Sequence, residues 1–370
     1  MDMEVNRFIF RQEDKLFQLW YPDTVNSLLG KKIMTTCYGA LHKYLRGITA
    51  PHFAPKNLKE VFIGEMERTI TESLRTWASK PSIEVKEAMT NMMFDLMAKN
   101  LISIGTTCPE TTELKKNFAM FSQGLISFPY IFQGQNFTKA CRTRLMMLEQ
   151  KDLNTNLHWL GRFLQGRKYV HKVLKDTLKE RIRAPEKRYG DFLDIFVAEM
   201  QSGDALEEHE AILKKREDMT SCITWEEFKS MKFTSQVIND ISRLSSVAPG
   251  IFKRTLADVQ INGYTIPSGW LVMMSPMAVH LNPENFKDPL TFNPWRWQES
   301  NAGSLMKNFI PFGDGTRYCI GADFTKLQIA LFIHMLVTKY RWKEIKGGDM
   351  FRISDIVFPQ GYHVQLLPRT

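Results

Sequence analysis

The chain contains few cysteines, and no pair of them stands in a metal-binding or disulfide-forming pattern. No two cysteines are separated by only two residues, so the spacing typical of a zinc site is missing. Their odd number and wide separation also argue against a disulfide framework, which fits a reducing compartment. The five cysteines are Cys37, Cys108, Cys141, Cys222 and Cys319.

Long apolar segments are missing as well. No stretch approaches the roughly 20 apolar residues with which a helix crosses a bilayer. The first residues, Met1–Arg7, contain acidic side chains and no apolar run, unlike a secretory signal. The sequence therefore predicts neither a transmembrane helix nor a signal peptide.

The chain also lacks a concentrated basic segment. Its 49 Lys and Arg residues outnumber its 40 Asp and Glu residues, for a net charge of +9, but they are scattered along the sequence. A nucleic-acid-binding protein presents a basic stripe, often laced with aromatic residues. We therefore expect no nucleic-acid partner, and the excess charge fits an acidic partner or an anionic surface.

Neither an internal repeat nor a linker rich in Pro, Gly or Ser divides the chain, so residues 1–370 are expected to form one domain. With 44% hydrophobic residues, including 25 Phe and 20 Met, the chain can bury a large core. Apolar residues recur at helical spacing in three long segments, Leu58–Trp77, Val85–Ile102 and Ala322–Tyr340. These segments are predicted to be helices that each bury one face.

Local signals predict the smaller elements and a mainly α chain with a small β portion. Thr224–Glu227 is a capping box that opens a helix running through Asp240 and Arg243. Asn262-Gly263 is a typical hairpin turn. Leu125–Phe132 is predicted to be a buried turn and Lys168–Arg183 a basic exposed helix. Trp270–Met274 is predicted to be a strand, and Ile353–Leu367 a strand with a turn.

The most informative segment is Phe312–Gly321, a glycine-rich loop that carries Cys319 just before an apolar helix. A thiolate is a good ligand for haem iron, and a helix N-terminus favours the deprotonated thiol through its N–H groups and dipole. Glycine lets the backbone approach a porphyrin closely, and Arg317 can neutralise a haem propionate. The segment predicts the proximal loop of a haem–thiolate protein; the alternative is a buried structural cysteine beside a turn.

The loop resembles the haem-binding signature of the cytochrome P-450 monooxygenases. The pattern F-x-x-G-x-R-x-C-x-G is met at Phe312, Gly315, Arg317, Cys319 and Gly321. The resemblance runs along the whole chain and is tightest in its C-terminal part. It is closest to plant members, in the group that includes brassinosteroid and triterpenoid hydroxylases.

This resemblance implies the P-450 fold and haem b, with Cys319 as the axial ligand of the iron. The implied reaction inserts one oxygen atom from O2 into a lipophilic steroid- or terpenoid-like substrate, with electrons from NADPH delivered by a flavoprotein reductase. It further implies a monomer on the cytosolic face of the endoplasmic reticulum. A chain without an anchor would be soluble or peripheral there.

Two more motifs agree with the resemblance. Asp240 and Arg243 stand three residues apart on one helix face, and Arg296 lies in a segment rich in Trp and Pro. They resemble the family's E-x-x-R and F-x-P-x-R-W motifs, whose acid and two arginines interlock behind the haem. The acid here is Asp and not Glu, so its shorter side chain predicts a weakened interlock.

The resemblance also implies further cations for the haem propionates. Lys253, with Arg254 beside it, stands where the family offers a base to one propionate. His42 and Arg46 match a helix that contributes two more donors. The acidic stretch Glu207–Glu210 lacks the H-E-x-x-H spacing of a metal site, so Cys319 is the one predicted metal ligand.

One expected part has no counterpart in the sequence. The family's long central helix, marked by a small residue, Gly, any residue, an acid and Thr, is not found: Ser103–Pro109 lacks the acid and ends in a helix-breaking proline. Arg142–Gln165 resembles nothing in the family and reads as an insert, and the anchor and first β strands are also missing. A second hypothesis is therefore a truncated relative without catalysis, which binds haem or ligand weakly or does not fold stably.

Overall fold

The protein is seen here as a computed structural model. The structure describes residues 3–21, 34–102, 115, 203–216, 218, 221–248, 250–298, 302–349, 351–352 and 356–369. The predicted turn at 125–132, the predicted helix at 168–183, the proposed insert at 142–165 and the segment 103–109 lie outside these residues.

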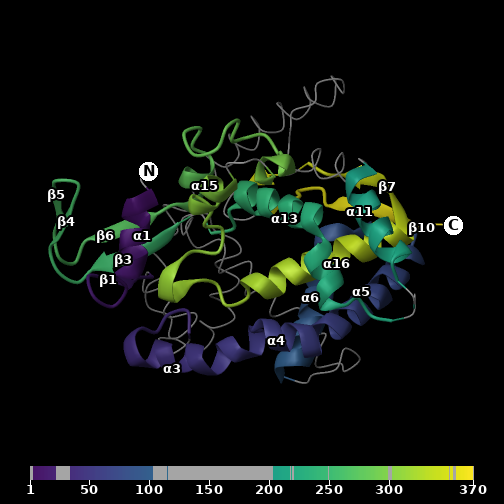
Figure 1. Cartoon of the computed structure of the whole chain (residues 1–370), viewed down its shortest axis with the longest axis horizontal. Helices are drawn as coiled ribbons and strands as arrows, with labels where there is room; N and C mark the ends of the chain where they lie inside the picture. Colours follow the sequence, from purple (N-terminus) through teal and green to yellow (C-terminus); the bar gives the residue numbers. More distant parts are fainter. Residues whose placement is uncertain are drawn as a thin grey trace, which may run out of the picture.

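Helices fill the middle of the molecule and a small sheet lies at each end (Figure 1). The helices are α1 (Met3–Arg11), α3 (Gly39–Thr49), α4 (Pro55–Asn57), α5 (Ile63–Ala78), α6 (Val85–Ile102), α11 (Gly203–Lys214), α12 (Trp225–Ser230), α13 (Lys232–Ser245), α14 (Pro276–His280), α15 (Ala302–Lys307) and α16 (Ala322–Lys339). Shorter 3₁₀ or π turns are η1 (Ala50–Phe53), η2 (Leu58–Phe62), η4 (Pro294–Trp297) and η5 (Gly315–Arg317).

The strands form two three-stranded antiparallel sheets and two hairpins. The first sheet has the order β1-β3-β6 and the second β2-β10-β7, while β4 pairs with β5 and β8 with β9. The strands are β1 (Phe17–Leu19), β2 (Ile83–Glu84), β3 (Ile251–Thr255), β4 (Val259–Ile261), β5 (Tyr264–Ile266), β6 (Leu271–Met274), β7 (Tyr340–Gly347), β8 (Phe351–Arg352), β9 (Ile356–Val357) and β10 (Tyr362–Pro368). The predicted mainly α architecture with a small β portion is confirmed.

The main core lies where α16 packs against α5. The apolar positions that predicted the helix from Ala322, namely Phe324, Leu327, Leu331 and Met335, are all buried. Burying such a face is what stabilises a helix of this length in water. The predicted helix over 58–77 is confirmed as η2 followed by α5, and the one over 85–102 as α6.

The sheet β1-β3-β6 positions Lys253, one of the predicted cations. Strand β3 is central, so Lys253 pairs with Leu19 of β1 on one side and Val272 of β6 on the other. The predicted hairpin is confirmed: Asn262 and Gly263 have φ of 50° and 81°, the two left-handed positions of a tight hairpin turn.

The helix predicted to run on from the capping box is in fact two helices. Met231 leaves the helical region, with φ −73° and ψ 66°, and separates α12 from α13. The new N-terminus is stabilised from outside, because the Glu208 carboxylate of α11 accepts hydrogen bonds from the backbone N–H groups of Phe233 and Thr234 at 2.6 and 2.9 Å. The capping box itself is present as predicted, with Thr224 and Glu227 bonded reciprocally.

Candidate functional site

The loop between α15 and α16 can be followed in Figure 1. By sequence Cys319 lies on this loop, two residues before Gly321, the N-terminal cap of α16. Its backbone N–H donates to the carbonyl of Phe312 at 2.9 Å, which closes the loop around η5. The thiol is free and exposed. A sulfur at the start of a buried helix, open to the outside, is therefore available as a ligand, and the alternative of a buried structural cysteine is wrong.

Gly315 lets the N-terminal helix approach this loop. Its φ is +65°, and a Cβ there would lie 2.8 Å from the backbone oxygen of Phe10 in α1. Any other residue would be strained and would also push α1 away. Gly321 differs, since a Cβ on it would meet no protein atom within 4 Å.

Two of the predicted cations meet at a carboxylate that the sequence did not reveal. Nε of Arg317 lies 2.9 Å from Oε1 of Glu13, and Nζ of Lys253 contacts the other oxygen, Oε2. The Glu13 and Lys253 side chains are 1% and 0% exposed. Burial lowers the pKa of Lys253, and the contact with Glu13 opposes that effect.

The helix α3 carries the other two predicted donors. His42 is buried on α3, and Arg46 follows one turn later. The pKa of His42 is lowered first by burial and then by the charges of Arg317 and Arg46, so the three side chains share one neighbourhood. Arg254 lies apart from them: it is exposed and its guanidinium stacks on Trp20 at 5.8 Å.

The predicted grouping of one acid with two arginines is confirmed, while the expected weakening of the interlock stays a prediction. Oδ1 of Asp240 lies 2.8 Å from Nε of Arg243 and 3.1 Å from Nε of Arg296. The second oxygen accepts from Nη2 of Arg243 at 3.3 Å and from the Asn293 backbone at 2.7 Å. One short carboxylate thus serves both guanidiniums.

Comparisons with known proteins agree with this geometry. A family model described as Cytochrome P-450 matches residues 204–361. Cytochrome P-450 87A3 of Oryza sativa subsp. japonica is 40% identical, over all of this chain and 76% of that protein. This chain belongs to the cytochrome P-450 family.

Two further P-450 proteins extend the comparison. Cucurbitadienol 11-hydroxylase of Siraitia grosvenorii is 33% identical, over all of this chain and 82% of its own length. The cyanobacterial CYP120A1 with bound retinoic acid superposes with a TM-score of 0.69 at 22% identity, over 99% of this chain and 88% of that one, which shows the P-450 fold. The alignment with 87A3 has 414 positions against 370 residues here, so at least 44 of its positions have no residue of this chain.

Membership of the P-450 family implies haem b on an axial thiolate and electrons from NADPH through a reductase. The residues at the Cys319 loop fit this group. Besides the exposed thiol, Nη2 of Arg317 is buried and has no hydrogen-bond partner in the described part of the chain. Such a donor needs an acceptor, and a propionate oxygen is one.

A second residue that the sequence did not reveal, His280, ties the P-450 interlock to the cysteine loop. Its Nε2 lies 3.0 Å from the backbone N–H of Ile310, and its Nδ1 lies 3.0 Å from the hydroxyl of Ser246. Arg243 in turn donates to the His280 carbonyl at 3.2 Å. No local motif marks this histidine, because its partners come from distant segments.

The acidic stretch near residue 208 is structural. Glu208 caps α13, and buried His209 contacts Thr234 at 3.0 Å and His334 at 3.1 Å. No cluster of three or more His, Cys, Asp or Glu residues suited to a metal ion occurs within the described ranges. None of the described helices is long and apolar enough to span a bilayer.

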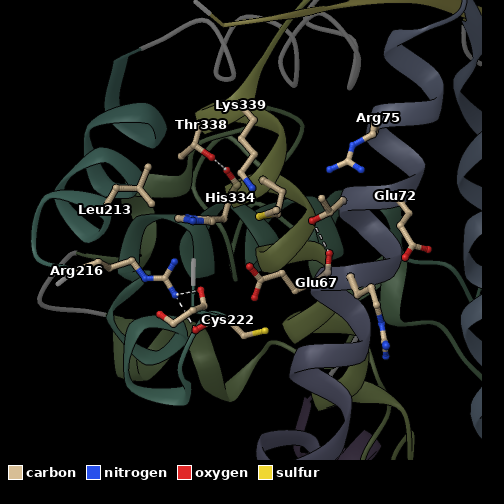
Figure 2. A pocket seen from close by; sticks show the side chains of 13 residues that line it. Glu67, Glu72, Arg75, Leu213, Arg216, Cys222, His334, Thr338 and Lys339 are labelled. Carbon is tan, nitrogen blue, oxygen red and sulfur yellow. Dashed lines mark hydrogen bonds between the residues drawn. The ribbon is translucent and has the colours of Figure 1, made fainter. Parts of the chain in front are cut away.

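A cleft of about 620 Å³ lies elsewhere, among α5, α11 and α16. Figure 2 shows its lining, where Arg216 donates to the backbone oxygens of Ser221 and Cys222, and where His334 and Lys339 come from α16. None of the predicted haem-site residues lines it. This cleft is therefore separate from the Cys319 loop.

Proposed function

We propose that this chain binds haem b through the Cys319 thiolate and acts as a monooxygenase. The observation that carries the proposal is the exposed thiol of Cys319 at the start of α16. Arg317 stands two residues before it, and its Nη2 is buried with no hydrogen-bond partner among the residues that the structure describes. A thiolate ligand and a cation for a propionate are the two things that a P-450 haem needs from its proximal loop. The reaction inserts one oxygen atom of O2 into a C–H bond.

Each predicted residue then has a role. The N–H groups and dipole of α16 favour the Cys319 thiolate. Arg317, Lys253 and Arg46 are proposed to neutralise the propionates, His42 to donate a hydrogen bond to one of them, and Gly315 and Gly321 to keep space beside the loop. When bound, haem supplies the redox chemistry that activates O2, with electrons from NADPH.

Phe312 is proposed to limit the access of water to the thiolate. Its ring is half-buried and lies 6.5 Å from the ring of Tyr318, while Nζ of Lys326 lies 5.6 Å from it on the helix side. The backbone oxygen of Phe312 accepts from the N–H of Cys319 at 2.9 Å, which ties this residue to the cysteine.

We infer a lipophilic steroid- or terpenoid-like substrate. Support comes from similarity over the whole chain to an enzyme named for the hydroxylation of cucurbitadienol. The proposed partners are a flavoprotein reductase and O2. The proposed state is a single-domain monomer on the cytosolic face of the endoplasmic reticulum.

Two observations on the sequence favour a second function. The sequence has no small-Gly-x-acid-Thr motif to relay protons, and its alignment with 87A3 leaves at least 44 positions without a residue. The alternative is a relative that binds haem on its proximal side and does not hydroxylate. An unroofed haem would release reduced oxygen without product.

The spectrum of the reduced protein under carbon monoxide tests the haem–thiolate proposal. We expect the red-shifted Soret band of a thiolate complex in the wild type and in Cys222→Ser, which removes the exposed thiol of the separate cleft. We expect Cys319→Ser to lose that band while its far-UV circular dichroism stays the same. An unchanged band in Cys319→Ser, or free-haem absorbance in the wild type, would contradict the proposal.

Product analysis separates the two functions. The haem-loaded protein is incubated with NADPH, a plant reductase and a panel of sterols and triterpenes, and the hydroxylated product is compared with hydrogen peroxide released. If the amount of hydroxylated product is a large fraction of the amount of NADPH consumed, the result supports the monooxygenase. Peroxide without product, from a protein that has the thiolate band, supports the alternative.

A further inference from the structure

Glu13 is a carboxylate buried between two cations that come from far along the chain. Its Oε1 accepts from Nε of Arg317 at 2.9 Å and from the backbone N–H of Leu19 at 3.2 Å, and its Oε2 contacts Nζ of Lys253. The Glu13 side chain is 1% exposed. A carboxyl group can be buried this deeply where its oxygens are hydrogen-bonded and paired with cations.

The contact leaves part of each cation available. Arg317 uses its Nε edge on Glu13, while its Nη1 lies 3.5 Å from the Met34 carbonyl and its Nη2 is buried without a described acceptor. Nζ of Lys253 lies 5.4 Å from the centre of the Phe10 ring and is fully buried. Arginine has five donors in a rigid fork, so fixing one edge fixes the direction of the others.

Among the buried groups of this cluster, two cations share the single carboxylate of Glu13. The charge of exposed Asp14 also reaches Lys253 and offsets part of the positive excess. A further carboxylate at the open side of Arg317 would complete the pairing. On the proposed function, from which this inference starts, that carboxylate belongs to haem.

We propose that Glu13 is a positioning residue for the haem propionates: it holds Lys253 and Arg317 in place and so strengthens the binding of haem without touching it. The competing explanation is that Glu13 only joins α1 and β1 to β3 and stabilises the fold. The two explanations differ in what they predict for a haem that has no charged propionates.

The test compares haem b with its dimethyl ester, in which both propionates are uncharged. Affinity for each is measured by Soret titration of the haem-free protein, for the wild type, Glu13→Gln and Glu87→Gln. Glu87 is an exposed carboxylate on α6, so its variant removes the same charge away from the cluster. We expect Glu13→Gln to weaken binding of haem b by about 10- to 100-fold, as for one lost charge-assisted hydrogen bond, and to leave binding of the ester nearly unchanged.

Several results would overturn the inference. Equal weakening of haem b and ester means that Glu13 acts on the fold alone, and an affinity for haem b equal to that of Glu87→Gln means that it has no role. If Glu13→Gln does not fold, Glu13→Asp takes its place, because it keeps the charge but shortens the side chain by one methylene. Its affinity for haem b must then fall more than its affinity for the dimethyl ester. A wild type that binds neither haem overturns the proposed function together with this inference.

Discussion

At the scale of single residues, His280 shows how hydrogen bonds select a protonation state. Ile310 donates its backbone N–H to Nε2, so that nitrogen is an acceptor and the proton of the neutral ring is on Nδ1, which donates to Ser246. In a doubly protonated ring, the N–H of Nε2 would face the backbone N–H of Ile310, and neither group could accept a hydrogen bond. The pKa of His280 is accordingly lowered to about 4, first by burial and then by the charge of Arg243.

This lowered pKa predicts a loss of stability in acid. Between pH 6.5 and 4 the unfolded chain binds a proton at residue 280 and the folded protein does not, so the free energy of unfolding falls as the pH falls, by up to about 1.4 kcal/mol per pH unit from this one group. Above pH 6.5 the contribution is constant. Urea unfolding of wild type and His280→Gln at a series of pH values measures it.

We expect the variant to be less stable than the wild type at pH 7 and the difference to shrink toward pH 4. His209 and His334, whose pKa values are lowered to about 3 and about 4, titrate in both proteins and cancel in the comparison. Two parallel stability curves would show that His280 is not held neutral in the folded protein.

The site residues divide by whether a local pattern marks them. Cys319, Arg317 and Asp240 stand in spaced motifs, and the structure places them as expected. Glu13 and His280 could not be found in this way, because their roles depend on partners 240 to 304 and 30 to 37 residues away. Glu13 and His280 are buried only by contacts that the tertiary fold creates, so the residues beside them in the sequence do not indicate that burial.

At the scale of elements, the Asp240 interlock joins α13 to the irregular segment that contains η4. Asp240 hydrogen-bonds Arg243 and forms an ion pair with Arg296. Both guanidiniums donate in turn to backbone oxygens of residues 280–291, including Thr291 at 3.1 and 2.9 Å. A segment with little regular structure has few backbone partners of its own. The two arginines supply hydrogen-bond donors to these backbone oxygens, in place of the backbone N–H groups that a sheet or helix would provide.

Asp240→Asn tests this interlock, because it keeps the volume and removes the charge that two buried arginines share. Breaking a buried pair in this way costs about 3–5 kcal/mol. Glu65→Gln is the control: Glu65 pairs with Arg68 and Lys99, which are 55% and 48% exposed, and an exposed pair is worth about 0–1 kcal/mol. Chemical denaturation that gave both variants the same small change would contradict the structural role assigned to Asp240.

Element boundaries were less predictable than the elements themselves. The capping box of Thr224 was readable because both of its bonds lie within four residues. The break at Met231 was not, because the second helix is capped by Glu208 from α11, and nothing near Met231 announces that partner. Tertiary contacts therefore decide where a helix stops even when its sequence permits it to continue.

At the scale of the whole molecule, the N-terminal helix α1 meets the cysteine loop, which lies about 300 residues further along the chain. Helix α1 contacts η5, and the contact depends on the missing side chain of Gly315. The P-450 fold itself followed from motifs in the C-terminal part, whereas the docking of the N-terminal part onto them did not. A contact across 300 residues has no periodicity to reveal it.

Gly315→Ala tests this contact. The new Cβ would lie 2.8 Å from the Phe10 oxygen at a φ of +65°, so we expect a loss of more than about 1 kcal/mol in unfolding free energy and weaker haem uptake. Gly303→Ala on α15, where a Cβ meets nothing within 4 Å, should be neutral or stabilising. Equal effects of the two substitutions would show that α1 does not press on the loop.

The long separation between Glu13 and Arg317 also has a consequence in time. Ribosomes add about 5–20 residues per second, so an arginine 304 positions later is made about 15–60 s after its carboxylate. Lys253 is made earlier, 240 positions after Glu13, so only the last part of that interval offers the carboxylate one of its two cations. The complete Glu13 cluster can form only once residue 317 has been made, so a group present almost from the start of synthesis gains its full set of partners near the end.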